Sequence, residues 1–372
     1  MDRTHLSHRS RRTGRAGNPG RTGNPGRTGN PARTSRTSRT SRTRRTRPAS
    51  PRRPLRAAVL AWVLVTGVAA GSAGCGAADS GDDAAGGEQR AVRTAMGVVR
   101  VPVAPQRVVV LDTAELDSAI TLGVKPVGAT RADVASGFLN YLPAEKVAGI
   151  RDVGAIGSPN LEAIAGLQPD LILTNKARDA TRYEELSAIA PTVMTETTGY
   201  PWKENFQVHA AALGKQAAAQ RVRAAYATHV GQVTAAIGGP AAAKETEVNV
   251  VRFIEGADIR IYGKKTYIGT LLADVGLGRP AITDRARDGF SYDVSPEQLD
   301  KADADAIFTS SYGDPAKSGQ TKATNSGLWK SMSAVRNGAT FKVDDQLWIQ
   351  GIGYTAAHAI LDELRRDVAS GG

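Results

Sequence analysis

The chain has 372 residues and a formal net charge of +12, but this charge is concentrated at one end. Residues 1–74 contain seventeen arginines and one acid, Asp2, for a net charge of +16, which leaves −4 for the rest. The length suits about two domains of ordinary size. A nucleic-acid-binding explanation of the basic composition would rest on the first segment alone, and we expect no nucleic-acid partner.

Residues 1–54 form an arginine-rich segment of low complexity, which includes the run GNPGRTGNPGRTGNPARTSRTSRTSRTRR. This segment has almost no apolar residues from which to build a core, so we expect a disordered tail. An alternative is that translation begins downstream of Met1, and much of the segment then does not belong to the protein.

Residues 55–75 have the features of an export signal. Arg52, Arg53 and Arg56 precede an uncharged apolar run, residues 57–70, which is shorter than the roughly 20 apolar residues of a membrane span. Small residues then lead to Cys75, the only cysteine in the sequence. This arrangement resembles a bacterial lipoprotein signal, in which the cysteine is diacylated, although Ser72 replaces the usual leucine. We therefore expect an extracytoplasmic protein anchored to the cell membrane at Cys75, exported by the Sec or the twin-arginine route.

Residues 76–91 are rich in Gly, Ala and acids and predict a flexible tether. An N-terminal α/β lobe is expected over residues 92–214, because short apolar runs alternate with helical patterns. Its strands are predicted at residues 98–102, 107–111, 126–129, 171–173 and 192–194.

One pattern in this lobe returns later in the chain. NLEAIAGLQPDLILT at residues 160–174 aligns without a gap with SPEQLDKADADAIFT at residues 295–309, and Glu162 falls on Glu297. Each copy predicts a short helix that leads into a buried strand, with Asn160 and Ser295 as N-caps and a capping box after Ser295. The repeat predicts two similar α/β lobes.

Residues 215–240 connect the lobes and predict one long helix, rich in Ala, Gln and Arg and ended by Gly238-Gly239-Pro240. The second lobe is expected over residues 241–372, with a first strand at 248–253 and a last helix at 355–368. The fold class is thus α/β, with two Rossmann-like lobes, parallel-rich sheets and a single interdomain helix.

Signatures of catalysis and of metal binding are missing from the sequence. Gly351-Ile352-Gly353 begins a match to a dinucleotide fingerprint, but too little chain follows to complete that fold, so these glycines are expected to shape a turn. His209, His229 and His358 lack the spacing of paired metal ligands. We expect no enzyme, no catalytic residues and no protein-bound metal.

The loops beyond the carboxyl ends of the strands are where open α/β sheets bind ligands, and they hold aromatic and cationic residues. Arg252 is notable because it interrupts the apolar strand VVRF, so it must face a cleft or be paired. The predicted ligand-binding residues are Arg131, Tyr200, Trp202, Arg252, Lys265, Tyr267, Tyr312 and Trp348.

Several motifs, in order, are similar to those of the siderophore-binding lipoproteins of ABC iron-uptake systems: PQRVVVLD, LGVKPVGA, NLEAIAGLQPDLIL, TTGYPWKENF, RFIEGADIRIYG and VDDQLWIQGIGYTAAHAILDELRR. The resemblance covers residues 92–370. It implies a monomeric receptor of the class III binding-protein fold that holds a ferric siderophore between its lobes, with no covalent cofactor. It also implies delivery to an ABC permease dimer with its ATPase, onto which Glu162 and Glu297 dock.

The mix of aromatic residues with Arg131 and Arg252 favours a nearly neutral ferric hydroxamate, such as a ferrioxamine, over anionic catecholate or citrate complexes. Lys176, Arg178 and Lys264 keep a more basic site open. Two other functions remain as alternatives: a haem or cobalamin receptor of the same fold, for which rim tyrosines would serve as axial ligands, and an extracytoplasmic α/β enzyme.

Overall fold

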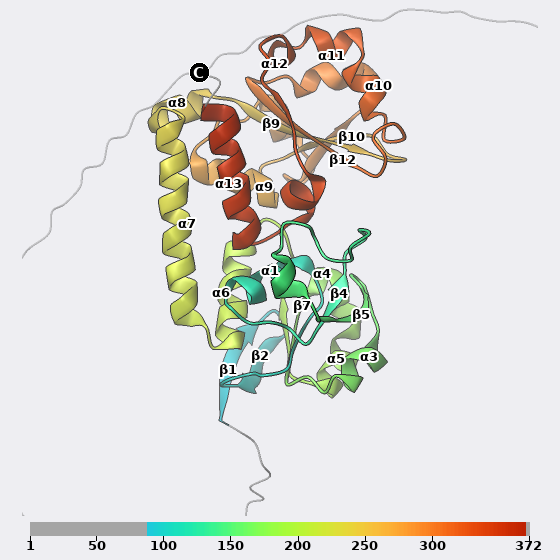
Figure 1. The fold of residues 1–372 in the computed structure, drawn as a ribbon, viewed down its shortest axis with the longest axis vertical. Coiled ribbons are helices and arrows are strands. Elements are labelled where there is room, and N and C mark those ends of the chain that lie inside the picture. Colours follow the sequence, from blue (N-terminus) through green and yellow to red (C-terminus); the bar gives the residue numbers. More distant parts are fainter. Residues whose placement is uncertain (1–87, 370–372) are drawn as a thin grey trace, which may run out of the picture. The chain divides into compact units, whose positions relative to one another are not determined.

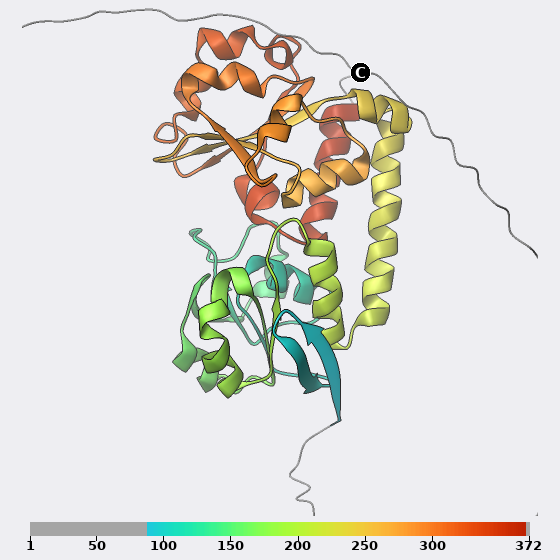
Figure 2. The same cartoon turned by 180° about the vertical axis from the view of Figure 1, so that it is seen from behind.

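The computed structural model describes residues 88–369, in which two α/β lobes are joined by one long helix (Figures 1 and 2). All of these residues belong to one compact unit. The predicted tail, the signal segment with Cys75 and residues 76–87 of the tether lie outside the described residues.

The N-terminal lobe is built on a six-stranded sheet with the strand order β6-β5-β4-β3-β7-β8. All neighbouring strands are parallel except β5 and β6. Its strands are β3 (Val108–Val110), β4 (Gly128–Arg131), β5 (Arg151–Ala155), β6 (Ser158–Pro159), β7 (Leu171–Asn175) and β8 (Thr192–Thr195). Every residue of β3, β7 and β8 is buried, because helices cover both faces of a parallel sheet.

Helices follow most of these strands, as the alternating pattern predicts. They are α1 (Thr113–Thr121), α2 (Ala144–Val147), α3 (Leu161–Gly166), α4 (Lys176–Asp179), the 3-10 turn η1 (Ala180–Arg182), α5 (Tyr183–Ile189) and α6 (Trp202–Leu213). A hairpin of β1 (Gln89–Thr94) and β2 (Gly97–Pro102) precedes the sheet and contacts β8 through a hydrogen bond from Ala95 N–H to the Met194 carbonyl, 2.9 Å. Regular structure therefore starts at Gln89, inside the expected tether, because Gln89 pairs with Pro102.

The predicted connecting helix is present as α7 (Gln216–Ala236), with Tyr226 and Val233 on its buried side. Figure 1 shows α7 running beside the last helix, α13 (Tyr354–Ala369). Gly238 adopts a φ of 107°, which a side chain disfavours, and this residue separates α7 from the short α8 (Gly239–Glu245).

The C-terminal lobe has a five-stranded sheet with the order β11-β10-β9-β12-β13. Strands β9, β12 and β13 are parallel, whereas β10 and β11 are antiparallel additions at the other edge. The strands are β9 (Val248–Ile254), β10 (Ile259–Tyr262), β11 (Ser291–Val294), β12 (Ala306–Tyr312) and β13 (Thr340–Lys342). The helices before α13 are α9 (Tyr267–Val275), η2 (Ala281–Arg285), η3 (Pro296–Ala302), α10 (Gln320–Thr324), α11 (Gly327–Ser331), α12 (Ser333–Arg336) and the π-helical turn η4 (Gln346–Gln350).

The repeated sequence pattern corresponds to a repeated structural unit, α3–β7 in one lobe and η3–β12 in the other. Asp170 accepts hydrogen bonds from the backbone N–H groups of Gln106 and Arg107, at 2.6 and 2.9 Å, just before β3. Asp305 accepts one from Glu247 N–H at 2.8 Å, just before β9. The aligned aspartates thus fix the start of the neighbouring central strand in both lobes.

The start of the second helix differs from the prediction. Asn160 caps α3 by accepting from the N–H of Ala163 at 2.9 Å. Ser295 makes no such side-chain bond, and the predicted capping box is wrong. Residues Pro296–Ala302 form a 3-10 helix, in which the N–H of Gln298 is already bonded to the carbonyl of Ser295 at 3.0 Å.

The two glycines before α13 shape a turn, as expected. The buried carboxylate of Asp117 on α1 accepts hydrogen bonds from the N–H groups of Thr355 and Ala356, at 3.1 and 3.2 Å, at the start of α13. A Cβ atom on Gly353 would overlap this carboxylate, and one on Gly351 would lie 2.6 Å from a backbone oxygen. Only glycine fits at these close approaches.

Aromatic side chains join the lobes on the side of α7. Trp202 at the start of α6 packs edge-on against Tyr226, Tyr267 and Tyr354, with ring centroids 4.6–5.5 Å apart. Its indole N–H donates to Thr270 of α9 at 3.0 Å. This cluster, drawn from α6, α7, α9 and α13, fixes the back of the space between the lobes.

Candidate ligand-binding site

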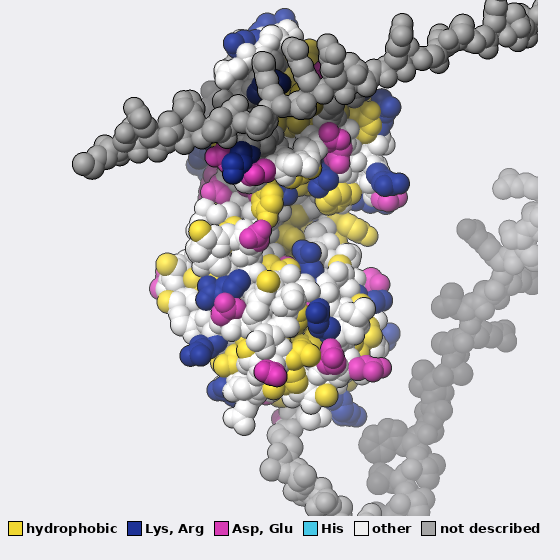
Figure 3. Space-filling model, turned by 90° about the vertical axis from the view of Figure 1, so that its right-hand side faces the viewer, with side chains coloured by type: hydrophobic (Ala, Val, Ile, Leu, Met, Phe, Trp, Pro, Cys, Tyr) yellow, Lys and Arg dark blue, Asp and Glu magenta, His cyan; other side chains and the backbone are white. Residues whose placement is uncertain are grey.

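A cavity of about 560 Å³ lies between the two lobes. Figure 3 views the molecule from the side opposite α7 and shows hydrophobic side chains gathered between the lobes. In the N-terminal lobe the lining residues follow the carboxyl ends of parallel strands, where open α/β sheets hold ligands. The polar and aromatic lining residues include Asp112, Asp133, Arg178, Tyr200, Arg252, Arg260, Tyr262, Lys265, Tyr267, Asp288, Phe290 and Trp348.

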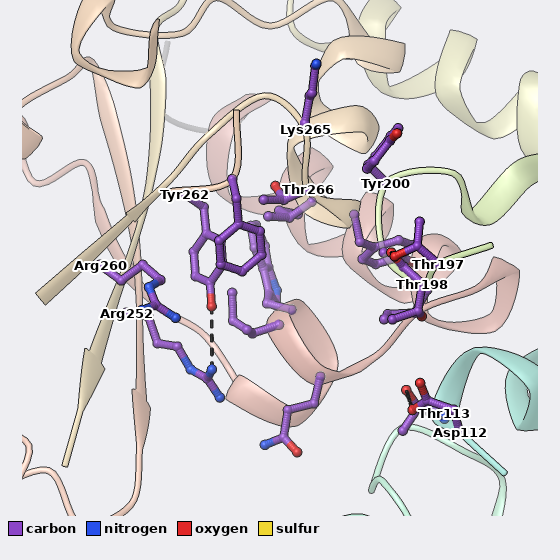
Figure 4. Close-up of a pocket in the computed structure, with 18 of the residues that line it drawn as sticks. Asp112, Thr113, Thr197, Thr198, Tyr200, Arg252, Arg260, Tyr262, Lys265 and Thr266 are labelled. Carbon is purple, nitrogen blue, oxygen red and sulfur yellow. Dashed lines mark hydrogen bonds between the residues drawn. The ribbon is translucent and has the colours of Figure 1, made fainter. Parts of the chain in front are cut away.

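Arg252 on β9 enters the cavity and is held from behind by Asp345. Its Nε and Nη2 atoms donate to the two carboxylate oxygens at 2.6 and 2.5 Å. Ser310 and Gln350 donate to the same carboxylate at 3.0 and 2.9 Å. Burial acts to lower the pKa of Arg252, but hydrogen bonding to Asp345 and the charges of Tyr262 and Asp345 together outweigh it, and the pKa is raised. The Nη1 atom points to the Tyr262 hydroxyl, 3.5 Å away (Figure 4), so the guanidinium is charged and fixed in orientation.

Arg260 lies directly opposite Arg252 in the β9–β10 ladder and extends beside it (Figure 4). Its guanidinium donates to both oxygens of Asp293, at 3.0 and 3.2 Å, and lies 5.6 Å from the ring centroid of Phe290. Tyr262 meets Phe290 edge-on at 5.8 Å. This wall of the cavity therefore combines two oriented cations with two aromatic rings.

Arg178 on α4 provides the cation of the opposite lobe. Its Nε donates to Asp112 at 2.9 Å, and Asn175 donates to Asp112 at 3.1 Å and to Glu115 at 3.3 Å. Burial, followed by the charge of Glu115, raises the pKa of Asp112. His209 lies behind this pair, 3.6 Å from Glu115. Each arginine of the cavity lining is thus matched by a carboxylate.

Five of the eight predicted ligand-binding residues line the cavity: Tyr200, Arg252, Lys265, Tyr267 and Trp348. Tyr200 and Lys265 are exposed, and Figure 4 shows them on the same side of the cavity. Both are therefore available to a ligand.

Tyr267 and Trp348 form the back of the cavity. The Tyr267 hydroxyl donates to the carbonyl of Gly353 at 2.7 Å and is buried. Trp348 is fully buried, because its ring stacks on Phe308 at 4.4 Å and its N–H donates to Glu363. These side chains shape the cavity, but their polar atoms are already bonded within the protein.

The other three predicted residues, Arg131, Trp202 and Tyr312, are not among the residues that line the cavity. Arg131 lies over the ring of Phe138, 4.4 Å from its centroid. Trp202 is 2% exposed, since it belongs to the aromatic core described above. Tyr312 is turned toward the other lobe, where its hydroxyl donates to Asp133 at 2.9 Å.

Arg260, Tyr262 and Phe290 line the cavity but are not in the predicted set. Arg260 could have been predicted from the sequence, because it interrupts the apolar strand IRIY just as Arg252 interrupts VVRF. Phe290 carried a weaker signal, since a single aromatic residue in a Gly-containing loop has no periodicity to orient it.

The predicted docking residues Glu162 and Glu297 are both exposed, in the first turns of α3 and η3. Across residues 88–369, no group of three or more His, Cys, Asp or Glu is arranged to hold a metal ion. In the same range, no helix combines the length and apolar character needed to cross a bilayer.

The chain is similar to known binding proteins, both by family profile and by sequence identity. A family profile described as periplasmic binding protein matches residues 108–347. "Probable siderophore-binding lipoprotein YfiY" of Bacillus subtilis (strain 168) is 34% identical, over 77% of this chain and 89% of its own. "Putative ABC transporter substrate-binding lipoprotein YhfQ" of the same organism is 28% identical, over 75% and 88%.

Among solved structures, Staphylococcus aureus SirA complexed with staphyloferrin B superposes with a TM-score of 0.68 and 30% identity, over 75% of this chain and 98% of its own. The family and these relatives are substrate-binding proteins and not enzymes, in agreement with the missing catalytic motifs. The matches span both lobes and the helix between them, and the chain belongs to the periplasmic binding protein family.

Proposed function

We propose that this protein is the extracytoplasmic receptor of an ABC iron-uptake system and binds a ferric siderophore between its lobes. The observation that carries the proposal is the cavity between the lobes, with Arg252, Arg260 and Arg178 held in fixed orientations around it. Relatives that match along both lobes are named as siderophore-binding or ABC transporter substrate-binding lipoproteins.

Iron is the cargo and is enclosed by the siderophore. Fe(III) is a hard ion that prefers oxygen ligands, and a hexadentate siderophore supplies these oxygens itself. The protein then needs hydrogen-bond donors for the outer oxygens and apolar surface for the organic arms. Arg252 and Lys265 can supply donors, while Tyr262 and Phe290 supply ring surface.

The charge balance of the cavity favours a hydroxamate siderophore of the ferrioxamine type. Arg178, Arg252 and Arg260 each have a carboxylate partner, at 2.9, 2.5 and 3.0 Å, so they add little surplus positive charge. Lys265 is balanced by the lining acids Asp133 and Asp288. A strongly anionic catecholate or citrate complex would require an excess of cations, which a nearly neutral ferric hydroxamate does not.

The anchor and the partner complete the proposal. Cys75 would be lipidated, so that Cys75→Ser should move the protein from the membrane fraction into the medium. The ligand would be passed to a permease dimer with its ATPase, with Glu162 and Glu297 as docking residues. Support for both comes from the lipoprotein and ABC transporter names of the relatives.

The ligand is tested by titrating the protein with ferric hydroxamates, a ferric catecholate, ferric citrate and haem while tryptophan fluorescence is recorded, since Trp348 lies at the cavity. We expect the ferrioxamine-type complex to bind most tightly. Arg252→Ala should weaken binding by about 1.5–3 kcal/mol, through loss of charged hydrogen bonds. Arg366→Ala is the control, because Arg366 is exposed on α13 and pairs with Asp367.

Tight catecholate binding without hydroxamate binding would reverse the ligand assignment. Binding of haem alone would favour a haem receptor of the same fold. Equal affinities of the wild type and the Arg252→Ala variant would remove Arg252 from the site.

A further inference from the structure

Tyr312 connects the two lobes beside the cavity. It is the last residue of β12 in the C-terminal lobe, and its hydroxyl donates to Oδ2 of Asp133 at 2.9 Å. Asp133 belongs to the N-terminal lobe, in the loop 132–143 between β4 and α2, and it lines the cavity. This hydrogen bond therefore joins the two lobes at the edge of the cavity.

The ring of Tyr312 has a second partner in the C-terminal lobe. The guanidinium of Arg252 lies over it, 4.6 Å from the ring centroid, a distance at which a cation is attracted by the aromatic face. Asp345 accepts hydrogen bonds from Nε and Nη2 of Arg252. The contacts form a continuous series from Asp345 through Arg252 and Tyr312 to Asp133.

The same loop has a second attachment to the C-terminal lobe. Asn140 donates through its backbone N–H to Gln346 at 3.0 Å and through its side chain to Asp344 at 2.8 Å. Asn140 is not among the cavity-lining residues, whereas Asp133 is. The Tyr312 bond is thus the attachment on the cavity side.

We propose that Tyr312 is a positioning residue: its ring orients Arg252 toward the ligand, and its hydroxyl holds loop 132–143 against the C-terminal lobe at the edge of the cavity until a ligand enters or leaves. The proposal rests on the proposed function in one respect only, the identification of the cavity as the ligand site. The hydrogen bond to Asp133, followed by burial, raises the pKa of Tyr312, so the hydroxyl remains a donor at neutral pH.

The two contacts of Tyr312 can be separated by mutation. Tyr312→Phe keeps the ring beneath Arg252 and removes only the bond to Asp133, whereas Tyr312→Ala removes both. Tyr292→Phe is the matched control, because Tyr292 also lies in the C-terminal lobe with a cation over its ring, Arg285 at 5.0 Å, and does not line the cavity.

The first measurement needs no ligand: hydrogen exchange of the full chain, followed at the amides of loop 132–143. We expect several-fold faster exchange there in Tyr312→Phe and no change in Tyr292→Phe. The second measurement is stopped-flow binding of the ferric complex that the wild type binds. Tyr312→Phe should raise the association and dissociation rates together, several-fold, with little change in affinity, while Tyr312→Ala should also lose affinity about as Arg252→Ala does.

Exchange and binding rates of Tyr312→Phe equal to those of the wild type would overturn the proposal. So would an affinity loss as large in Tyr312→Phe as in Tyr312→Ala, because the ring would then have no role of its own. If the wild type binds none of the ferric complexes, the proposed function fails, and the exchange measurement still decides whether Tyr312 holds the loop.

Discussion

Asp117 shows how one buried charge ties the last helix to the first lobe. Its carboxylate is fully buried and receives the N–H groups at the start of α13, yet burial outweighs these bonds and raises its pKa to about 6. A carboxyl group whose pKa is higher in the folded than in the unfolded state stabilises the protein below its unfolded pKa, and this contribution is lost as the pH rises through the folded value.

We therefore expect Asp117 to cost about 2 kcal/mol of folding free energy between pH 4 and pH 7. The measurement is urea unfolding of the wild type and of Asp117→Asn at several pH values, because the amide is similar in shape but does not titrate. The free energy of unfolding of the wild type, measured relative to that of Asp117→Asn, should increase as the pH is lowered from 7 to 4. Parallel pH profiles would show that Asp117 titrates as an ordinary surface acid.

The comparison with the variant is needed because another group acts in the opposite direction. His358 on α13 has a lowered pKa, first through burial and then through the neighbouring His229, whose Nδ1 lies 2.8 Å from its own. A lowered histidine pKa gives stability that is present above the unfolded pKa and is lost as the pH falls. The wild type and Asp117→Asn both retain the contribution of His358, so it cancels in the difference between their free energies of unfolding.

At the level of elements, the repeated units α3–β7 and η3–β12 offer a direct comparison of two helix starts. Asn160→Ala removes a side-chain cap and should destabilise the protein by about 1 kcal/mol. Ser295→Ala removes no capping bond and should change stability by only a few tenths of that. Thermal unfolding of both variants checks this, and an equal loss in both would mean that Ser295 caps η3 in solution.

The elements that could be predicted from the sequence are those whose burial or composition produces a recognisable pattern of residue types. Strands β7, β9 and β12 read as apolar runs because parallel strands are covered on both faces, and α7 reads as a helix from its composition. The capping box at Ser295 could not be judged from residue types alone, since the choice between an α-helical and a 3-10 first turn depends on the packing of η3. The sequences of β10 and β11 also contain no pattern that shows whether these strands run parallel or antiparallel to β9.

The lining of the cavity was predicted in outline and not in detail, for a similar reason. Arg252 was placed at a cleft or beside a partner because it is a charged residue within an apolar strand, and in the structure it both lines the cavity and pairs with Asp345. Trp202 was misplaced because an aromatic residue at the start of a helix can face either a cavity or a core. Which one it faces depends on α9 and α13, which lie far away in the sequence.

For the whole molecule, the matching exposed acids Glu162 and Glu297 are the residues that we propose for docking to the permease. Single changes to alanine should leave folding and ligand binding nearly unchanged but reduce uptake of the ferric siderophore by cells. The double variant Glu162→Arg, Glu297→Arg should abolish uptake, because like charges at an interface cost several kcal/mol.

Glu145→Arg is the control for this experiment, since Glu145 is an exposed acid in the first turn of α2 and lies outside the repeated pattern. Uptake at the wild-type rate by the double variant would leave both glutamates as acids that only favour a helix start, an effect of about 0.3–1 kcal/mol each.

The place of α13 in the chain has a consequence for the order of folding. Each sheet is built from one continuous stretch, residues 108–195 and 248–342, so each can form from locally connected chain. Helix α13 follows both sheets in the chain but packs against α1 and α7. Until it docks, Asp117 lacks the amides that it receives from α13, and a chain that is shortened before Tyr354 would leave this carboxylate and the hydroxyl of Thr121, on the same face of α1, without their partners in α13.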